Sequence, residues 1–108
     1  MSQERTHNIY VIELKPEVKK TKRFMELNPD YIEGKKCFYV GYTSKTPEKR
    51  FEDQKNGYKH SRRVQKYGIA LRPWHYAHHN PMTKEDAIAM EEEKARRLRK
   101  KGYGVWQF

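Results

Sequence analysis

The residue whose position in this chain most clearly demands a chemical partner is Glu91. The stretch 83–101 predicts a helix, because Thr83 with Asp86 resembles a capping box and nothing interrupts the run before Gly102. At about 100° per residue, one arc of this helix should face the core, and Glu91 falls near the middle of that arc. The other members of the arc are Ala87, Ile88, Ala95 and Leu98.

A carboxylate on a buried stripe is costly unless a positive group meets it. For Glu91 that group is either an arginine, which would make the residue structural, or a divalent cation. Mg²⁺ is a suitable cation because it binds through one or two carboxylates and keeps several waters. Both alternatives stay open on the sequence alone.

Two tyrosines on neighbouring strands are the next candidates for chemistry. Alternation over 8–14 and a run of β-forming residues over 37–42 predict two strands that carry Tyr10 and Tyr39. Gly41 shares a strand face with Tyr39 and would let another group approach the backbone closely. These residues with an inward glutamate could form a polar pocket, although strand tyrosines are usually core residues.

The remaining elements complete a single small α+β (α/β) domain over 1–108. The segment 15–36 separates the two strands and is expected to hold a short helix over 21–27. Thr46 and Pro47 suit the start of a helix. Helices are predicted over 47–55 and 61–67, and the second should end at Gly68 in the αL conformation. An edge strand is predicted over 71–78, and the residues 103–108 are expected to return to the sheet.

The charge balance points to a polyanionic partner. The 108 residues include 24 Lys and Arg against 14 Asp and Glu, a formal net charge of +10. Such a field attracts nucleic acid, although each basic cluster could also be a solvated face. The clusters lie at 19–23, 59–63 and 96–101. A membrane partner is not expected, because no cluster is backed by an apolar helical stripe.

Cysteine usage and hydropathy exclude several classes of protein. The single cysteine, Cys37, rules out an intramolecular disulfide framework and a zinc site built from cysteines. Apolar runs are only a few residues long, and the first residues lack the apolar segment of a secretion signal. We therefore expect a soluble, cytoplasmic protein that is a monomer or a weak homodimer.

Four motifs in order resemble the GIY-YIG nuclease domain. They are Asn8-Ile9-Tyr10, Phe38-Tyr39-Val40-Gly41, Thr46-Pro47-Glu48-Lys49-Arg50-Phe51 and Ala87-Ile88-Ala89-Met90-Glu91. The ending Gly102-Tyr103-Gly104-Val105-Trp106 is similar to that of compact bacterial or phage members. The resemblance implies a small mixed or antiparallel sheet of about three strands flanked by helices. It departs from the family in the inserted segment 15–36, in Asn8 at a glycine position, and in Gly104 near the place of an asparagine.

The resemblance also implies roles for individual residues. Tyr10 would activate or orient the attacking water, with Tyr39 assisting, and Arg50 would hold the scissile phosphate. Glu91 would ligate one Mg²⁺ or Mn²⁺ ion, and His60 would help the base. A phenol with an ordinary pKa near 10 is a poor base at neutral pH, so nearby cations would have to lower that pKa.

These expectations combine into one function and two alternatives. The first is a metal-dependent endonuclease that hydrolyses phosphodiester bonds, with DNA favoured over RNA as the substrate. The second is a non-catalytic nucleic-acid-binding module on the same fold, and the third is a protein whose basic surface meets an acidic partner. Nucleic acid is expected to contact Gly41, Lys59, Arg62 and Arg63.

Overall fold

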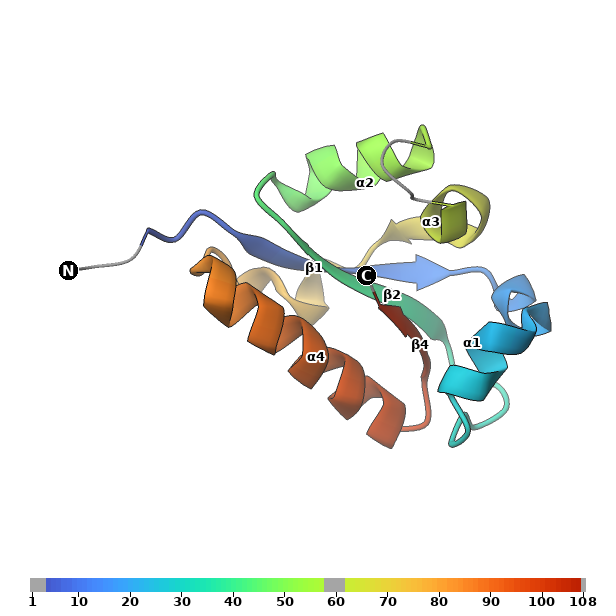
Figure 1. Ribbon diagram of the computed structural model, residues 1–108. Helices are drawn as coiled ribbons and strands as arrows, with labels where there is room; N and C mark the ends of the chain where they lie inside the picture. The colour runs from blue at the N-terminus through green and yellow to red at the C-terminus, as the bar shows by residue number, and fades with distance from the viewer. Residues whose placement is uncertain (1–3, 58–61, 108) are drawn as a thin grey trace.

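The computed structural model describes residues 4–57 and 62–107 and has an α+β fold built on one mixed sheet (Figure 1). Among these residues the sheet has four strands, in the order β3-β1-β2-β4. The expectation of about three strands is therefore wrong, because the segment that follows the last helix adds a strand parallel to β2. The strands are β1 (Asn8–Leu14), β2 (Cys37–Thr43), β3 (Gly68–Leu71) and β4 (Gly104–Gln107).

Helices cover both faces of this sheet. In Figure 1, α2 and α3 lie on one side of the strands and α4 lies on the other. The helices are α1 (Lys22–Leu27), α2 (Pro47–Lys55), α3 (Arg62–Tyr67) and α4 (Lys84–Lys100). Because both sides are covered, Ile9 to Ile12 of β1 are all buried. The alternation in the sequence predicts instead that only every second residue of this strand is buried. No helix in the described ranges is both long and apolar enough to span a membrane.

The predicted edge strand over 71–78 is wrong. Pairing with β1 begins earlier, at Gly68, and ends at Leu71. Pro73 then starts two short 3₁₀ turns, η2 (Pro73–His75) and η3 (Ala77–His79), since proline cannot donate a ladder hydrogen bond. Gly68 has no positive φ and begins β3, so its predicted αL conformation is also wrong. Gly102, which follows α4, does have a positive φ, of +93°.

The segment between β1 and β2 is ordered by one buried amide. It contains the 3₁₀ turn η1 (Pro16–Lys20) and the predicted short helix, α1. Asn28, at the end of α1, donates to the carbonyl oxygens of Phe24 at 2.7 Å and Val105 at 3.0 Å. Its Oδ1 accepts from the Val105 amide at 2.8 Å and from Arg99 Nε at 3.1 Å. Asn28 therefore ties the segment to β4 and to α4.

The helix α4 begins and packs as predicted, with one exception. The Thr83 hydroxyl accepts from the amide of Asp86 at 3.1 Å, which caps the first turn. The core-facing residues Ala87, Glu91, Ala95 and Leu98 are buried. Ile88 is 40% exposed, so its predicted place in the core is wrong. The helix therefore brings Glu91 inward and leaves its polar side in solvent.

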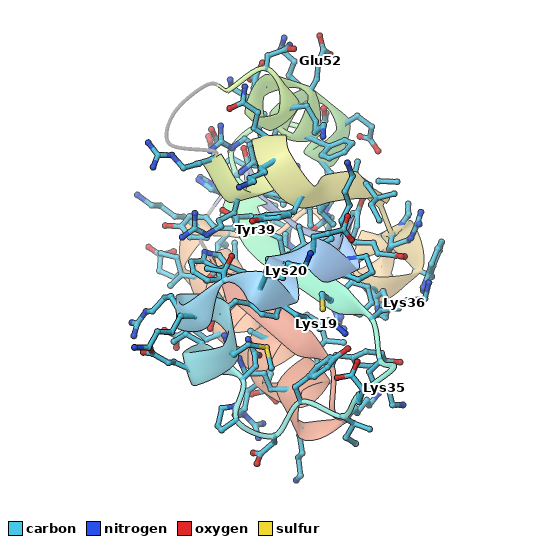
Figure 2. All side chains as sticks on the ribbon, turned by 90° about the vertical axis from the view of Figure 1, so that its right-hand side faces the viewer. Lys19, Lys20, Lys35, Lys36, Tyr39 and Glu52 are labelled. Carbon is cyan, nitrogen blue, oxygen red and sulfur yellow. The ribbon has the colours of Figure 1, made fainter. Side chains whose placement is uncertain are left out.

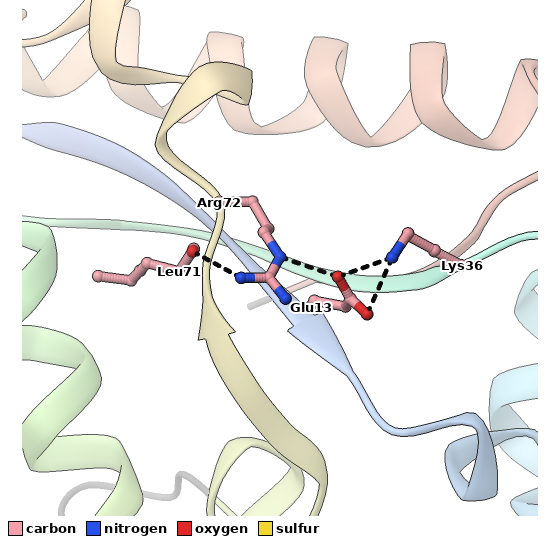
Figure 3. Close-up of polar contacts among 4 residues, drawn as sticks. All are labelled: Glu13, Lys36, Leu71 and Arg72. Atoms are coloured by element: carbon pink, nitrogen blue, oxygen red, sulfur yellow. Dashed lines mark hydrogen bonds and ion pairs between the residues drawn. The ribbon is translucent and has the colours of Figure 1, made fainter.

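An ion-pair cluster joins β1 to the segments beside it on the α4 side of the sheet (Figure 3). The Glu13 carboxylate accepts from Arg72 Nε at 2.8 Å and from Lys36 Nζ at 3.3 Å. Burial acts to raise the Glu13 pKa, but the bonds and charges of Arg72 and Lys36 outweigh it and lower that pKa. The cluster therefore holds two cations in fixed places.

We predict that Asn28→Ala lowers the free energy of unfolding by about 3 kcal/mol, because it leaves the Val105 amide and Arg99 Nε without their buried acceptor. Urea unfolding measures this loss. Asn56→Ala, an exposed change of the same size at the end of α2, is the control. Equal losses in the two variants would contradict the proposed role of Asn28.

Candidate active site

The sheet places Tyr10, Tyr39 and Gly41 on one face. Tyr10 lies opposite Gly41 in the antiparallel register, and the rings of Tyr10 and Tyr39 are 6.2 Å apart. A Cβ atom at position 41 would lie 2.6 Å from the Tyr10 hydroxyl, so a glycine is needed there. The close approach predicted at Gly41 is therefore made by Tyr10 itself, and in Figure 2 Tyr39 lies in the middle of the molecule.

Helix α2 adds a buried arginine to these phenols. The Thr46 hydroxyl accepts from the amide of Lys49 at 3.1 Å, and this cap fixes the start of the helix. Arg50, one turn on, is only 8% exposed, and its positive charge lowers the pKa of both Tyr10 and Tyr39. No acidic side chain in the described ranges forms an ion pair with Arg50.

The alternative in which Arg50 pairs with Asp53 is wrong. Asp53 instead accepts from Lys45 at 2.6 Å and lies 3.3 Å from the ammonium of Lys49. These lysines satisfy the carboxylate on the outer side of α2 and leave Arg50 turned toward the sheet. A buried guanidinium without a carboxylate partner is suited to binding an anion such as a phosphate.

Gln54 belongs to the same cluster and was missed by the sequence reasoning. Its side chain is fully buried, four residues after Arg50 and so on the same face of α2. The Gln54 amide acts to lower the pKa of both phenols, which places it close to them. Its two polar atoms have no well-formed hydrogen bond within the described part of the chain. The spacing of four from Arg50 is the signal that could have found it.

Glu91 approaches from α4, on the other side of the sheet (Figure 1). It is 5% exposed, and its Oε1 accepts from Gln107 Nε2 at 3.3 Å. Its Oε2 is buried, with no hydrogen-bond partner among the described residues. An arginine partner for Glu91 is thus excluded within those residues, and the neutral amide of Gln107, also missed from the sequence, stands in its place.

Burial sets the protonation of this carboxylate. Desolvation raises the pKa of Glu91 to about 7, Gln107 opposes the shift, and the neighbouring charge of Glu92 adds to it. Near neutral pH the group is therefore divided between its charged and neutral forms. A cation at Oε2 would favour the charged form.

The phenols respond to burial in the same way. Desolvation raises the Tyr39 pKa to about 12, and the Tyr10 pKa is also raised, first by burial and then by Tyr39. Arg50 lowers both values but does not outweigh burial. Both hydroxyls are therefore protonated at neutral pH, and the buried Tyr10 hydroxyl has no hydrogen-bond partner among the described residues. The negative charge of Glu91 also raises the Tyr39 pKa, whereas the positive charge of Arg50 lowers it. Tyr39 is therefore influenced by both charges.

The remaining predicted site residues are Lys59, His60, Arg62 and Arg63. His60 and Lys59 fall outside the described residues. Arg62 is exposed on α3, and the guanidinium of Arg63 lies 4.5 Å from the centre of the Trp106 ring. Their contact with nucleic acid, like that of Gly41, stays a prediction.

Fit to a metal ion depends on Glu91 alone. Within 4–57 and 62–107, no group of three or more His, Cys, Asp or Glu side chains could hold an ion. A divalent ion at Glu91 Oε2 would therefore keep mostly water or phosphate ligands, as Mg²⁺ commonly does.

Two surface cavities, of about 540 and 510 Å³, lie elsewhere: one is lined by Met82, Met90 and Glu93 among others, and one by Lys45, Lys49 and Asp53 among others.

Comparison of this chain with protein-family models, curated proteins and solved structures finds no match. The resemblance to GIY-YIG nucleases therefore depends on the motifs alone. Any functional proposal must be supported by the geometry of Tyr39, Arg50 and Glu91.

We predict that Glu91→Gln stabilises the metal-free protein more at about pH 8 than at about pH 4. The Glu91 pKa is about 7 in the folded chain against an ordinary 4.5, so folding is progressively disfavoured as pH rises through this window. The difference should approach about 3 kcal/mol in the free energy of unfolding.

Urea unfolding at the two pH values measures this effect, with Glu52→Gln, an exposed change on α2, as the control. A stability difference between Glu91→Gln and the wild type that does not change with pH would contradict the raised pKa.

Proposed function

We propose that this chain is a GIY-YIG-type endonuclease that hydrolyses DNA phosphodiester bonds with one Mg²⁺ or Mn²⁺ ion. The observation that carries the proposal is the Oε2 atom of Glu91, buried and without a protein partner in the described residues. Such an oxygen is suited to a cation. The unpaired guanidinium of Arg50 is suited to the phosphate on which that cation would act.

The fold supports the family assignment in outline. Tyr10 and Tyr39 lie on adjacent antiparallel strands, Arg50 lies on the helix after the second strand, and Glu91 lies on the long helix. This is the order that the four motifs imply. The sheet has one strand more than the resemblance implies, and the segment 15–36 lies between β1 and β2 as the sequence predicts.

Glu91 would hold the metal, which when bound would stabilise the negative charge that develops on phosphate oxygens. Arg50 would bind the phosphate and neutralise charge through paired N–H donors. Tyr39, 6% exposed and protonated, would donate a hydrogen bond to the water or to a phosphate oxygen. Tyr10, fully buried, would hold the Tyr39 ring and the Gly41 backbone in place. This differs from the sequence-based expectation that Tyr10 activates the water.

The burial of Tyr10 favours a second candidate, the non-catalytic nucleic-acid-binding module. A phenol with no exposed surface and a raised pKa is poorly placed to act as a base. In that function Arg50 would still bind a phosphate. Salt-dependent binding without turnover would distinguish this module from an endonuclease.

We predict that the protein nicks supercoiled plasmid or cuts branched DNA when Mg²⁺ or Mn²⁺ is added, and that Glu91→Gln lowers the rate by about a hundredfold or more. Glu92→Gln, an exposed change on the same helix, should retain activity. Arg50→Gln should also lose cleavage, whereas the neighbouring change Lys49→Gln should affect it only slightly.

Equal rates for Glu91→Gln and the wild type would overturn the proposed site. Binding without cleavage across both metals and both substrates would select the binding module. In either case, circular dichroism of each variant shows whether lost activity reflects lost folding.

A further inference from the structure

A row of aromatic rings, which we call the aromatic row, lies on the α4 side of the sheet. It consists of Trp74, His75, Phe38 and Tyr103. The ring centres are 6.0 Å apart for Trp74 and His75, 5.1 Å for His75 and Phe38, and 5.2 Å for Phe38 and Tyr103. Trp74 is 68% exposed, more than any other large hydrophobic side chain in the described part of the chain. Such exposure of an indole is typical of a binding surface.

Cations lie along the whole aromatic row. The Arg72 guanidinium is 5.6 Å from the centre of the Trp74 ring, and the Lys35 ammonium is 5.1 Å from that of Tyr103. Burial lowers the His75 pKa, and the charges of Lys94 and Lys101 lower it further. These lysines of α4 and its C-terminal cap therefore lie close to the middle of the row.

Acidic groups of the described residues balance only part of this charge. Glu13 binds Arg72 and Lys36, and Figure 3 shows its carboxylate between them. Within the described residues, Lys94 and Lys101 form no ion pair. Lys94 is only partly exposed, and its pKa is lowered by burial, by Arg97 and by Lys101. An anion placed here would relieve both the repulsion and the incomplete solvation.

Arg72 also lies beside the exposed indole of Trp74. Its Nε donates to Glu13 at 2.8 Å, which restrains the guanidinium that stacks near Trp74. An aromatic ring held in place loses less conformational entropy when a ligand stacks on it. The row therefore combines a restrained stacking platform with unpaired positive charge.

We propose that the aromatic row binds single-stranded nucleic acid, with one base stacked on Trp74 and the backbone phosphates on Lys94 and Lys101. Stacking on a side chain requires a base that is free of its own duplex, so a single strand is favoured over a double helix. The charge of the row is complementary to a polyanion. This surface is on the side of the sheet opposite Tyr10 and Arg50, and the inference does not depend on the proposed hydrolysis.

The test is binding of a fluorescein-labelled short oligothymidylate in EDTA, which prevents any metal-dependent cleavage. Fluorescence anisotropy gives the Kd as a function of salt. The two indole N–H signals in a proton–nitrogen NMR spectrum report the site, and Trp74→Phe assigns the signal of Trp74. The oligonucleotide should shift the Trp74 signal.

Variants separate stacking from charge. Trp74→Ala should weaken binding about tenfold, in line with the loss of one base–aromatic stack, and Trp74→Phe should restore part of it. The double change Lys94→Gln with Lys101→Gln should reduce the salt dependence of log Kd by about 1.4, the slope expected for two single-strand phosphates. Lys20→Gln with Lys22→Gln removes the same charge from exposed positions in η1 and α1 and is the matched control.

An unmoved Trp74 signal, or an unchanged Kd in Trp74→Ala, would overturn the proposal. Equal weakening by the two lysine double variants would show that only net charge matters and would overturn it as well. Failure of plasmid cleavage by the wild type, with the Trp74 effects intact, would refute the proposed hydrolysis and leave this surface established.

Discussion

A carboxylate that is buried without a cation is the constraint on which this structure depends. Glu91 is carried inward because Ala87, Ala95 and Leu98 on the same side of α4 must pack against the sheet. Among the described residues only the amide of Gln107 donates to it, and burial raises the Glu91 pKa to about 7. A chain selected for stability alone would place a neutral residue there, since an unpaired buried charge costs several kcal/mol. The proposed cation site rests on this oxygen, Glu91 Oε2.

On the other side of the sheet, the positive charge of Arg50 has no carboxylate partner in the described part of the chain. Arg50 could neutralise Glu91, but the strands separate α2 from α4, and Asp53 is held by Lys45 and Lys49. Tyr39 responds to both charges, because Arg50 lowers its pKa and Glu91 raises it. The sheet thus keeps a buried carboxylate and a buried guanidinium from pairing with each other. Such local violations of good pairing are expected at functional sites.

Local rules predicted much of the fold, and long-range contacts decided the rest. Alternation located β1, a run of β-forming residues located β2, and threonine caps with helical patterns located α2 and α4, because those signals lie within the elements themselves. The edge strand was misplaced, since Gly68 can serve as either a helix terminator or a strand start and only pairing with β1 decides. The inward position of Glu91 followed from periodicity, but Gln107 as its partner did not, because sixteen residues and a chain reversal separate the two.

The most direct test of the central claim is a carbon-13 NMR titration of the Glu91 side-chain carboxyl, with and without Mg²⁺. The account predicts an apparent pKa of about 7 in the metal-free protein and a clear decrease when Mg²⁺ is added, because a bound cation favours the charged form. An apparent pKa near the ordinary value of 4.5, unaffected by Mg²⁺, would contradict it.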